Sequence, residues 1–187
     1  MTESDTGHQE RLTGFLLHPA SALHDTGWAH PELQGRMRAL SSAVSKDMLA
    51  LHDRIAQMEA RSAAEEDLRR VQTQELVDRV LTLSDRAMEE ERSIPLDSDT
   101  LVSGASWDAA VGSSGAVLTA VDGLAAGNIK NAFVATRPPG DHATPGRDMG
   151  FCLFYHVAVG ARYSLERGVA SRVLIVDWDV HHGNGTK

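Results

Sequence analysis

The chain has 187 residues, and its 18 Lys and Arg against 26 Asp and Glu give a formal net charge of −8. Hydrophobic residues make up 42% of the chain, an ordinary value for a globular protein, and a domain of this length buries a core without metal or disulfides. The acidic balance argues against nonspecific binding of nucleic acid, which requires clustered Lys and Arg. The lone cysteine, Cys152, excludes an intramolecular disulfide and is typical of a reducing compartment.

The sequence predicts neither a secretory signal nor a membrane span. Residues 1–11 are polar and contain no apolar core of a signal peptide. The longest charge-free apolar stretch, Ala109 to Val121, includes Gly and Ser and is too short to cross a bilayer. We therefore expect a cytoplasmic protein that is not secreted.

The predicted elements of the first half follow a polar tail, residues 1–12. Residues 13–18 (TGFLLH) predict a short buried strand, and residues 19–35, rich in His, Gly and Pro, predict a loop. From residue 36 to residue 55, apolar residues recur at three- and four-residue intervals, which predicts one face of a helix. A second helical pattern runs from about residue 64 to residue 81.

The second half predicts a strand–helix–strand unit behind a helix of small residues. The small-residue helix covers Trp107–Ala126, and the unit comprises a strand at Asn131–Thr136, a helix at Phe151–Glu166 and a strand at Arg172–Asp177. The strands of such a unit run parallel, and ligands of open α/β sheets bind beyond their carboxyl ends. Seven polar residues follow those two ends and are expected to converge: Arg137, Asp141, His142, Asp177, Asp179, His181 and His182.

Asp179 and His181 are candidate metal ligands. They stand two residues apart, so in extended chain their side chains point the same way and can reach one ion. A carboxylate with an imidazole suits zinc or another divalent first-row metal. A catalytic zinc takes three protein ligands, of which two are recognisable here. The competing interpretation is a strand end whose polar residues are merely solvated.

Several segments around these candidates belong to one recognisable pattern. They are RPPGDHA at 137–143, GFCLFYHVAVGARY at 150–163 and VLIVDWDVHHGNGT at 173–186, with weaker matches at 24–36 and 66–77. Together they resemble the histone deacetylase and acetylpolyamine amidohydrolase superfamily, in its class II-like and bacterial branch.

The resemblance extends from about residue 14 to residue 187 and covers about the first half of the family's catalytic domain. It implies an α/β protein with an arginase/deacetylase-like three-layer fold around a central parallel sheet, here incomplete at the C-terminus. We accordingly divide the chain into a flexible tail, residues 1–12, and the N-terminal part of a deacetylase-like α/β domain, residues 13–187.

The activity that the resemblance implies is zinc-dependent hydrolysis of acetyl-lysine in a histone, another protein or a peptide, or of an acetylpolyamine, with release of acetate. Zinc polarises the acetyl carbonyl and activates water in such enzymes. Asp179 and His181 match two zinc ligands, and a structural monovalent cation near Asp177 and Asp179 is compatible with the pattern. Neither nucleic acid nor a membrane is implied as a direct partner.

The resemblance also implies roles for residues around the metal. His142 matches the second histidine of the family's tandem pair, the general base and acid, and Asn184 lies where a polar partner of that histidine sits. Asp177 matches the carboxylate paired with the first histidine. Gly150 and Phe151 match the substrate tunnel, with Phe151 as a wall for the acyl-lysine stem. Three further matches are Arg36 near the acetate-release channel, His182 in the shell that supports the ligands, and Cys152 in the wall beneath the site.

This sequence departs from the family at several site positions. Asp141 stands in place of the first histidine, and with Asp177 it would put two like charges in one site, so we expect Asp141 to be protonated or paired with a cation. Gln72 replaces a histidine in what we interpret as a structural position. Tyr155 and His156 replace an Asn-Asn or Asn-Ser pair, and we expect His156 to be hydrogen-bonded on a packed helix rather than a ligand. No residue here matches the family's third zinc ligand or its oxyanion-stabilising tyrosine.

These departures leave two further readings open. The first is a truncated, non-catalytic deacetylase relative that acts as a binding module. The second is a manganese ureohydrolase of the arginase type, which shares the fold but prefers D-x-H-x-D, whereas Gly183 follows His181 by two residues here. Which acetylated substrate is bound, and the oligomeric state, are not decided by the sequence.

Overall fold

A three-stranded parallel sheet lies at the centre of the molecule. In the computed structural model, which describes residues 12–186, its strands are β1 (Leu12–Leu17), β2 (Ile55–Met58) and β5 (Ile129–Ala135), in the order β2-β1-β5. β1 pairs with both neighbours, so that Phe15 is opposite Gln57 on one side and Phe133 on the other. The predicted first strand is therefore confirmed, and it occupies the middle of the sheet.

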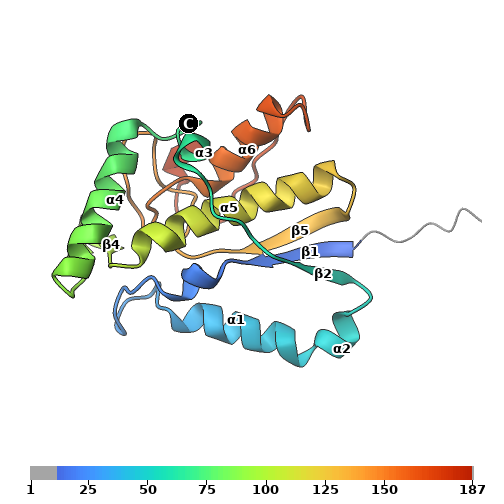
Figure 1. Cartoon of the computed structure of the whole chain (residues 1–187), viewed down its shortest axis with the longest axis horizontal. Helices are drawn as coiled ribbons and strands as arrows, with labels where there is room; N and C mark the ends of the chain where they lie inside the picture. Colours follow the sequence, from blue (N-terminus) through green and yellow to red (C-terminus); the bar gives the residue numbers. More distant parts are fainter. Residues whose placement is uncertain (1–11, 187) are drawn as a thin grey trace, which may run out of the picture.

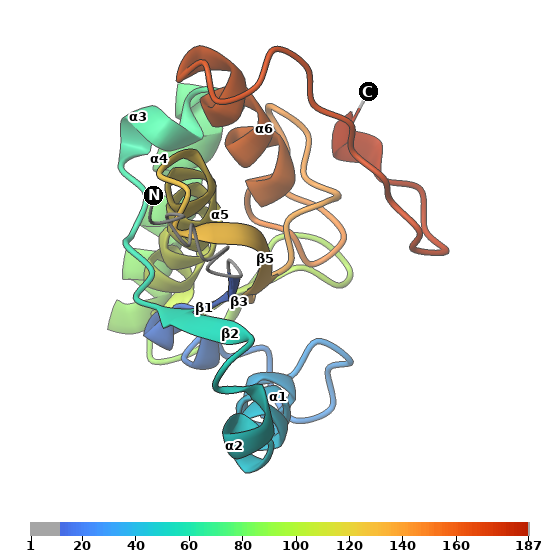
Figure 2. The ribbon, with the colours of Figure 1, turned by 90° about the vertical axis from the view of Figure 1, so that its right-hand side faces the viewer.

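Helices cover both faces of this sheet, which gives the expected three layers (Figures 1 and 2). α5 (Ser106–Ala125) lies on one face, with α4 (Gln74–Glu89) and α6 (His156–Glu166) around it. α1 (Gly35–Lys46) and α2 (Met48–Leu51) lie on the other. The remaining short elements are a 3-10 turn at Pro19–Ala22, α3 (Glu65–Leu68), the antiparallel pair β3 (Ile94–Pro95) and β4 (Leu101–Val102), and a 3-10 turn at Asn184–Thr186.

The main core lies between α4, α5 and α6. α4 is capped by Thr73, whose hydroxyl accepts a hydrogen bond from the Leu76 amide at 3.3 Å, and the helix buries Leu76, Val77 and Val80. These side chains pack with Leu118 of α5 and with others from α6. The helical spacing recognised in the sequence therefore marks the core face.

The small residues of α5 allow close packing against the loops before α3. A Cβ at Gly115 would overlap the carbonyl oxygen of Arg61, and one at Gly112 would overlap the ring of His18. Gly lowers the intrinsic helix propensity, but burial of most of the helix compensates for it. Among residues 12–186, no helix is both long and apolar enough to cross a membrane.

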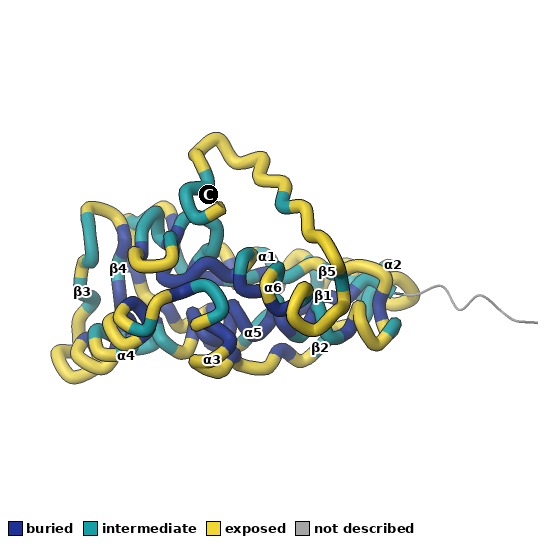
Figure 3. Tube along the Cα trace, turned by 90° about the horizontal axis from the view of Figure 1, so that it is seen from above, coloured by how far each residue is buried: buried dark blue, intermediate teal, exposed yellow. Residues whose placement is uncertain are grey.

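The predicted strand at 172–177 is wrong. The segment is extended, but it has no sheet partner among the described residues, and Figure 3 shows it as an exposed strip outside the body of the fold. Leu174 is 86% exposed and Val176 is 68% exposed. A strand needs a hydrogen-bonded neighbour, and the described sheet ends at β5, whose parallel neighbour is β1 instead. The predicted strand–helix–strand unit is therefore not formed.

Three predicted boundaries also differ from the structure. The single helix expected over 36–55 is two helices, and Ile55 begins β2. The helix expected from Phe151 begins at His156, because residues 149–152 form a tight turn in which the φ of Phe151 is +67°. The tail predicted for residues 1–12 lies outside the described residues, except for Leu12, which belongs to β1.

Candidate metal centre

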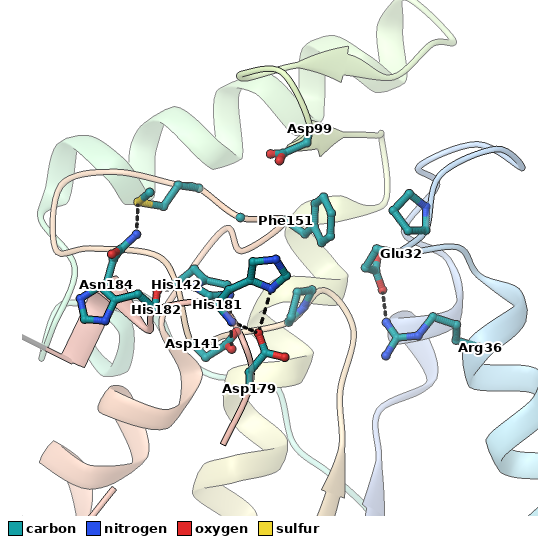
Figure 4. A pocket seen from close by; sticks show the side chains of 14 residues that line it. Glu32, Arg36, Asp99, Asp141, His142, Phe151, Asp179, His181, His182 and Asn184 are labelled. Atoms are coloured by element: carbon teal, nitrogen blue, oxygen red, sulfur yellow. Dashed lines mark hydrogen bonds and ion pairs between the residues drawn. The ribbon is translucent and has the colours of Figure 1, made fainter. Parts of the chain in front are cut away.

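A cavity of about 560 Å³ brings together most of the predicted site residues (Figure 4). Its lining comes from four parts of the chain: Pro31, Glu32 and Arg36; Asp99; Pro139, Asp141, His142, Met149, Gly150 and Phe151; and Asp179, His181, His182 and Asn184. Asp177 does not line it and faces a neighbouring hollow of about 470 Å³, which it shares with Asp179 and His181. Five of the seven residues expected to converge therefore line this cavity, whereas Arg137 and Asp177 do not, and the second strand that suggested the convergence is absent from the described sheet.

Asp179 and His181 form the candidate metal pair. Asp179 Oδ2 lies 3.0 Å from His181 Nδ1 and also accepts the His181 amide at 3.0 Å. These hydrogen bonds lower the pKa of the Asp179 carboxyl, so the group is ionised, as a ligand must be. The side chains are 48% and 78% exposed. An ionised carboxylate only accepts hydrogen bonds, so the contact puts a proton on His181 Nδ1. Two zinc ligands in a tetrahedron lie about 3.3 Å apart, so the pair fits one edge of a zinc site once the metal replaces that proton.

The described residues supply only these two candidate zinc ligands. No group of three or more His, Cys, Asp or Glu side chains in residues 12–186 is placed to hold a metal ion. The donor types and spacing of Asp179 and His181 fit zinc, while the remaining ligands have no counterpart in this part of the chain. The monovalent cation suggested near Asp177 and Asp179 stays a prediction.

His142 lies beside this pair, with its ring centroid 6.3 Å from that of His181. Its Nδ1 lies 3.2 Å from the carbonyl oxygen of His182. A carbonyl only accepts hydrogen bonds, so this contact assigns the ring proton to Nδ1 and leaves Nε2 as the basic nitrogen of the neutral ring. Asn184, the predicted partner of His142, instead donates its amide to Met149 Sδ at 3.8 Å.

Asp141 lies between His142 and the buried thiol of Cys152. Its Oδ2 is 3.6 Å from His142 Nε2, and its Oδ1 accepts the Cys152 thiol at 3.3 Å. Asp177 has a separate partner, since its Oδ1 accepts the Asp179 amide at 3.0 Å. Burial raises the pKa of the Cys152 thiol to about 12, so it stays protonated. Cys152 lies buried behind Asp141 and does not itself line the cavity.

Gly150 and Phe151 form a strained turn in the cavity wall. Both have left-handed φ angles, +58° and +67°, between the bridged residues Met149 and Cys152. A Cβ at Gly150 would lie 2.9 Å from the His142 side chain, so this position requires Gly for space as well as for conformation. The Phe151 amide donates to Thr100 Oγ1 at 3.2 Å, which fixes the turn against the loop of Asp99. Non-Gly residues in this conformation concentrate at functional sites.

Glu32 and Arg137 fix the N-terminal loop in the cavity wall. Arg137 was grouped with the residues expected to converge on the site, but its side chain is fully buried and lies 2.7 Å from the Glu32 carboxylate. Burial raises the pKa of Glu32 and lowers that of Arg137, while the attraction between their charges opposes both shifts. Glu32 also accepts Arg36 Nη1 at 3.1 Å, which directs this guanidinium along the cavity (Figure 4).

Two departures from the family pattern have structural roles. Gln72 donates to the Thr144 carbonyl at 2.7 Å and accepts the Tyr155 amide at 3.1 Å, so it holds the loop behind the site, as predicted. His156 is buried and hydrogen-bonds to Ser114 Oγ at 2.7 Å, and burial lowers its pKa to about 4. The prediction that His156 is a packed residue rather than a ligand is confirmed.

Sequence reasoning missed Asp99 and Met149 as cavity residues. Met149 immediately precedes the candidate residues Gly150 and Phe151, so its position next to them was a usable signal. Asp99 is more than thirty residues from any other lining residue in the sequence, and although residues 99–110 also resemble the family, that resemblance gave Asp99 no role in the site.

Comparison with known proteins identifies the family. The model of the histone deacetylase domain matches residues 30–187. A histone deacetylase-like amidohydrolase of Pseudomonas aeruginosa is 35% identical over 174 residues, which cover 93% of this chain and 42% of that protein. Histone deacetylase clr3 of Schizosaccharomyces pombe is 37% identical over 166 residues, which cover 84% of this chain and 24% of that protein. The crystal structure of the HDA15 HD domain superposes with a TM-score of 0.84 at 33% identity, covering 95% of this chain and 49% of that one.

The chain therefore belongs to the histone deacetylase domain family. Its fold matches that of a solved family domain over nearly its whole length. It spans less than half the length of the relatives named above. The family assignment agrees with the resemblance of the sequence motifs, and the cavity is built from those same motifs.

Proposed function

We propose that this chain contributes a zinc-binding edge and a substrate wall to an amidohydrolase that removes acetyl groups from acetyl-lysine or from acetylpolyamines. The observation that carries the proposal is the Asp179–His181 pair, with donor atoms 3.0 Å apart, in one cavity with His142 and Phe151. The family supports it, because relatives bear names such as histone deacetylase and histone deacetylase-like amidohydrolase.

Each residue has a chemical task in this proposal. Asp179 and His181 hold zinc, which when bound polarises the acetyl carbonyl and activates water. His142 Nε2 takes a proton from the attacking water and returns one to the departing amine nitrogen. Phe151, held in its left-handed turn, lies along the aliphatic stem of the acyl-lysine. Asn184 and the Asp177 carboxylate support this arrangement from the metal-bearing segment.

Asp141 favours a second candidate, a non-catalytic binding module of the same family. A carboxyl group cannot carry the positive charge of an imidazolium, and only its protonated form donates a hydrogen bond to the reacting water. Its Oδ1 already accepts the Cys152 thiol, which uses part of its capacity. Asp141→His restores an imidazole hydrogen-bond donor at position 141. Acetate release that appears or rises in this variant assigns the defect to Asp141, and an unchanged rate means that Asp141 does not limit the reaction.

A zinc titration followed by calorimetry tests the metal proposal. We expect one zinc per chain, and we expect binding to be lost in Asp179→Ala because half of the donor pair is removed. Asp85→Ala is the matched control, since Asp85 is exposed on α4 outside the cavity. Absence of zinc binding in the unmodified chain, or equal binding in both variants, would contradict the proposal.

A further inference from the structure

The segment that carries the candidate metal ligands has little attachment to the rest of the fold. It has no strand partner among the described residues, and the amides of Asp179 and His181 donate only to carboxylates within the segment. Both ligand side chains are substantially exposed. The position of Asp179 and His181 in the cavity wall therefore depends on contacts made further along, in residues 182–186.

Among those contacts, the one with Tyr155 combines a hydrogen bond with close packing. Its side chain is buried in a small cluster with Ala143 and Cys152, directly before α6. Its phenol oxygen hydrogen-bonds to Thr186 Oγ1. A Cβ at Gly185 would overlap both the Tyr155 ring and the Ala143 carbonyl oxygen, so the backbone of the segment lies directly against them.

Tyr155 is itself firmly placed. Its amide donates to Gln72 Oε1 at 3.1 Å, and its carbonyl accepts the Val159 amide at 3.0 Å in the first turn of α6. The ring is thus anchored in the core beside α6, and its hydroxyl reaches the exposed segment at Thr186. A second contact, from His142 Nδ1 to the His182 carbonyl, lies three residues before Gly185.

We propose that Tyr155 is a positioning residue that docks the metal-bearing segment, through its hydroxyl to Thr186 and its ring to Gly185, and so holds Asp179 and His181 in the cavity wall. Its effect on metal affinity rests on the proposed function, whereas the docking itself does not. Tyr155 acts through the segment and touches neither candidate ligand.

The substitution that isolates this contact is Tyr155→Phe, which keeps the ring and removes the hydroxyl. Thr186→Val removes the partner hydroxyl from an exposed residue, so it leaves the core intact, and Thr186→Ser keeps that hydroxyl. Tyr163→Phe is the matched control, since Tyr163 is a buried tyrosine of α6 whose hydroxyl bonds to Asp122 at 2.9 Å, away from the cavity.

Hydrogen exchange without metal tests the docking. The Thr186 amide bonds to the Gly183 carbonyl at 3.2 Å, so its exchange rate reports whether the turn is held in place. One hydrogen bond of ordinary strength corresponds to about a five-fold change in an equilibrium constant. We expect about five-fold faster exchange in Tyr155→Phe and in Thr186→Val. Thr186→Ser and Tyr163→Phe should exchange at the unmodified rate.

Zinc titration of the same variants tests the consequence for the ligands. We expect zinc affinity to fall about five-fold in Tyr155→Phe and in Thr186→Val, and to be retained in Thr186→Ser and Tyr163→Phe. Unchanged exchange in both hydroxyl-deleting variants, or an equal change in Tyr163→Phe, would overturn the proposal. If the unmodified chain binds no zinc, the metal proposal fails, and the exchange rates still decide whether Tyr155 docks the segment.

Discussion

Replacement of Arg137 by Met should destabilise the protein more than any surface change. The guanidinium is fully buried and lies 2.7 Å from the Glu32 carboxylate, which is itself 3% exposed. Its terminal nitrogens also donate to four oxygens of the N-terminal loop: the carbonyls of Ser21, His24 and Glu32 and the hydroxyl of Thr26. Met fills a similar volume but leaves the Glu32 carboxylate buried without its guanidinium. These four oxygens also lose the Arg137 donors, although the Glu32 carbonyl still accepts the Thr26 hydroxyl.

Removal of one partner of a buried ion pair costs about 3–5 kcal/mol, a large part of the 5–15 kcal/mol that stabilises a typical domain. Urea unfolding followed by far-ultraviolet circular dichroism measures the loss. Arg137→Met combined with Glu32→Gln should lose less than Arg137→Met alone, because the uncompensated charge is gone. A loss below about 1 kcal/mol in the single variant would refute the reasoning, since it would mean that Arg36, which also bonds to Glu32, suffices.

Two other predictions concern histidines and a glycine. His24 and His156 are buried, with pKa values lowered to about 3 and about 4, so the unfolded chain takes up protons that the folded chain does not. Their contribution to stability is present at pH 7 and is lost as the pH falls from about 6.5 towards 4, by about 2 kcal/mol each at pH 5. Urea unfolding at both pH values should show this, and His156→Gln should remove about half of the difference. Gly150→Ala should lower the free energy of unfolding by about 1–2 kcal/mol because Ala is strained in the left-handed backbone. It should lower this energy more than Gly168→Ala does, because the added Cβ also crowds the His142 side chain.

A specific result would contradict each of these two predictions. A pH dependence that is the same in His156→Gln as in the unmodified chain would mean that His156 is not the group that takes up the proton. Gly168 has a φ of +67° and nothing within 4 Å of an added Cβ, so its substitution measures the backbone cost alone. Equal losses at Gly150 and Gly168 would show that the wall beside His142 yields without cost.

The parts of the fold that the sequence predicted are those whose signal is local. The apolar spacing near α4 and the small residues of α5 predicted helices in these regions, because each pattern reflects the face that the helix buries. The single pattern over 64–81 is divided into α3 and α4 in the structure, and α4 continues to Glu89. The segment from residue 172 has an equally strong strand pattern. A strand also requires a hydrogen-bonded neighbour, and the apolar pattern of one segment does not indicate whether such a neighbour is present. The turn at Phe151 was missed because a left-handed backbone at a non-Gly residue has no sequence signal.

The candidate site was predictable to the extent that its residues stand next to one another in motifs. Asp179 and His181, and likewise Gly150 and Phe151, were found as pairs and lie in the cavity wall as pairs. Contacts between distant segments were not predictable. The Glu32–Arg137 pair joins residues more than a hundred positions apart and changes the role expected of Arg137 from site residue to buried anchor.

The exposed segment also affects the tryptophan fluorescence of the protein, because it carries Trp178. Of its three tryptophans, Trp28 is 91% exposed and Trp178 is 93% exposed, while Trp107 packs edge-on against Phe154 in the core. Emission from this protein should therefore be dominated by indoles in water, and iodide should quench most of it. Because Trp178 immediately precedes Asp179, a Trp28→Phe variant turns that indole into a reporter whose shielding from iodide follows any ordering of the adjacent chain.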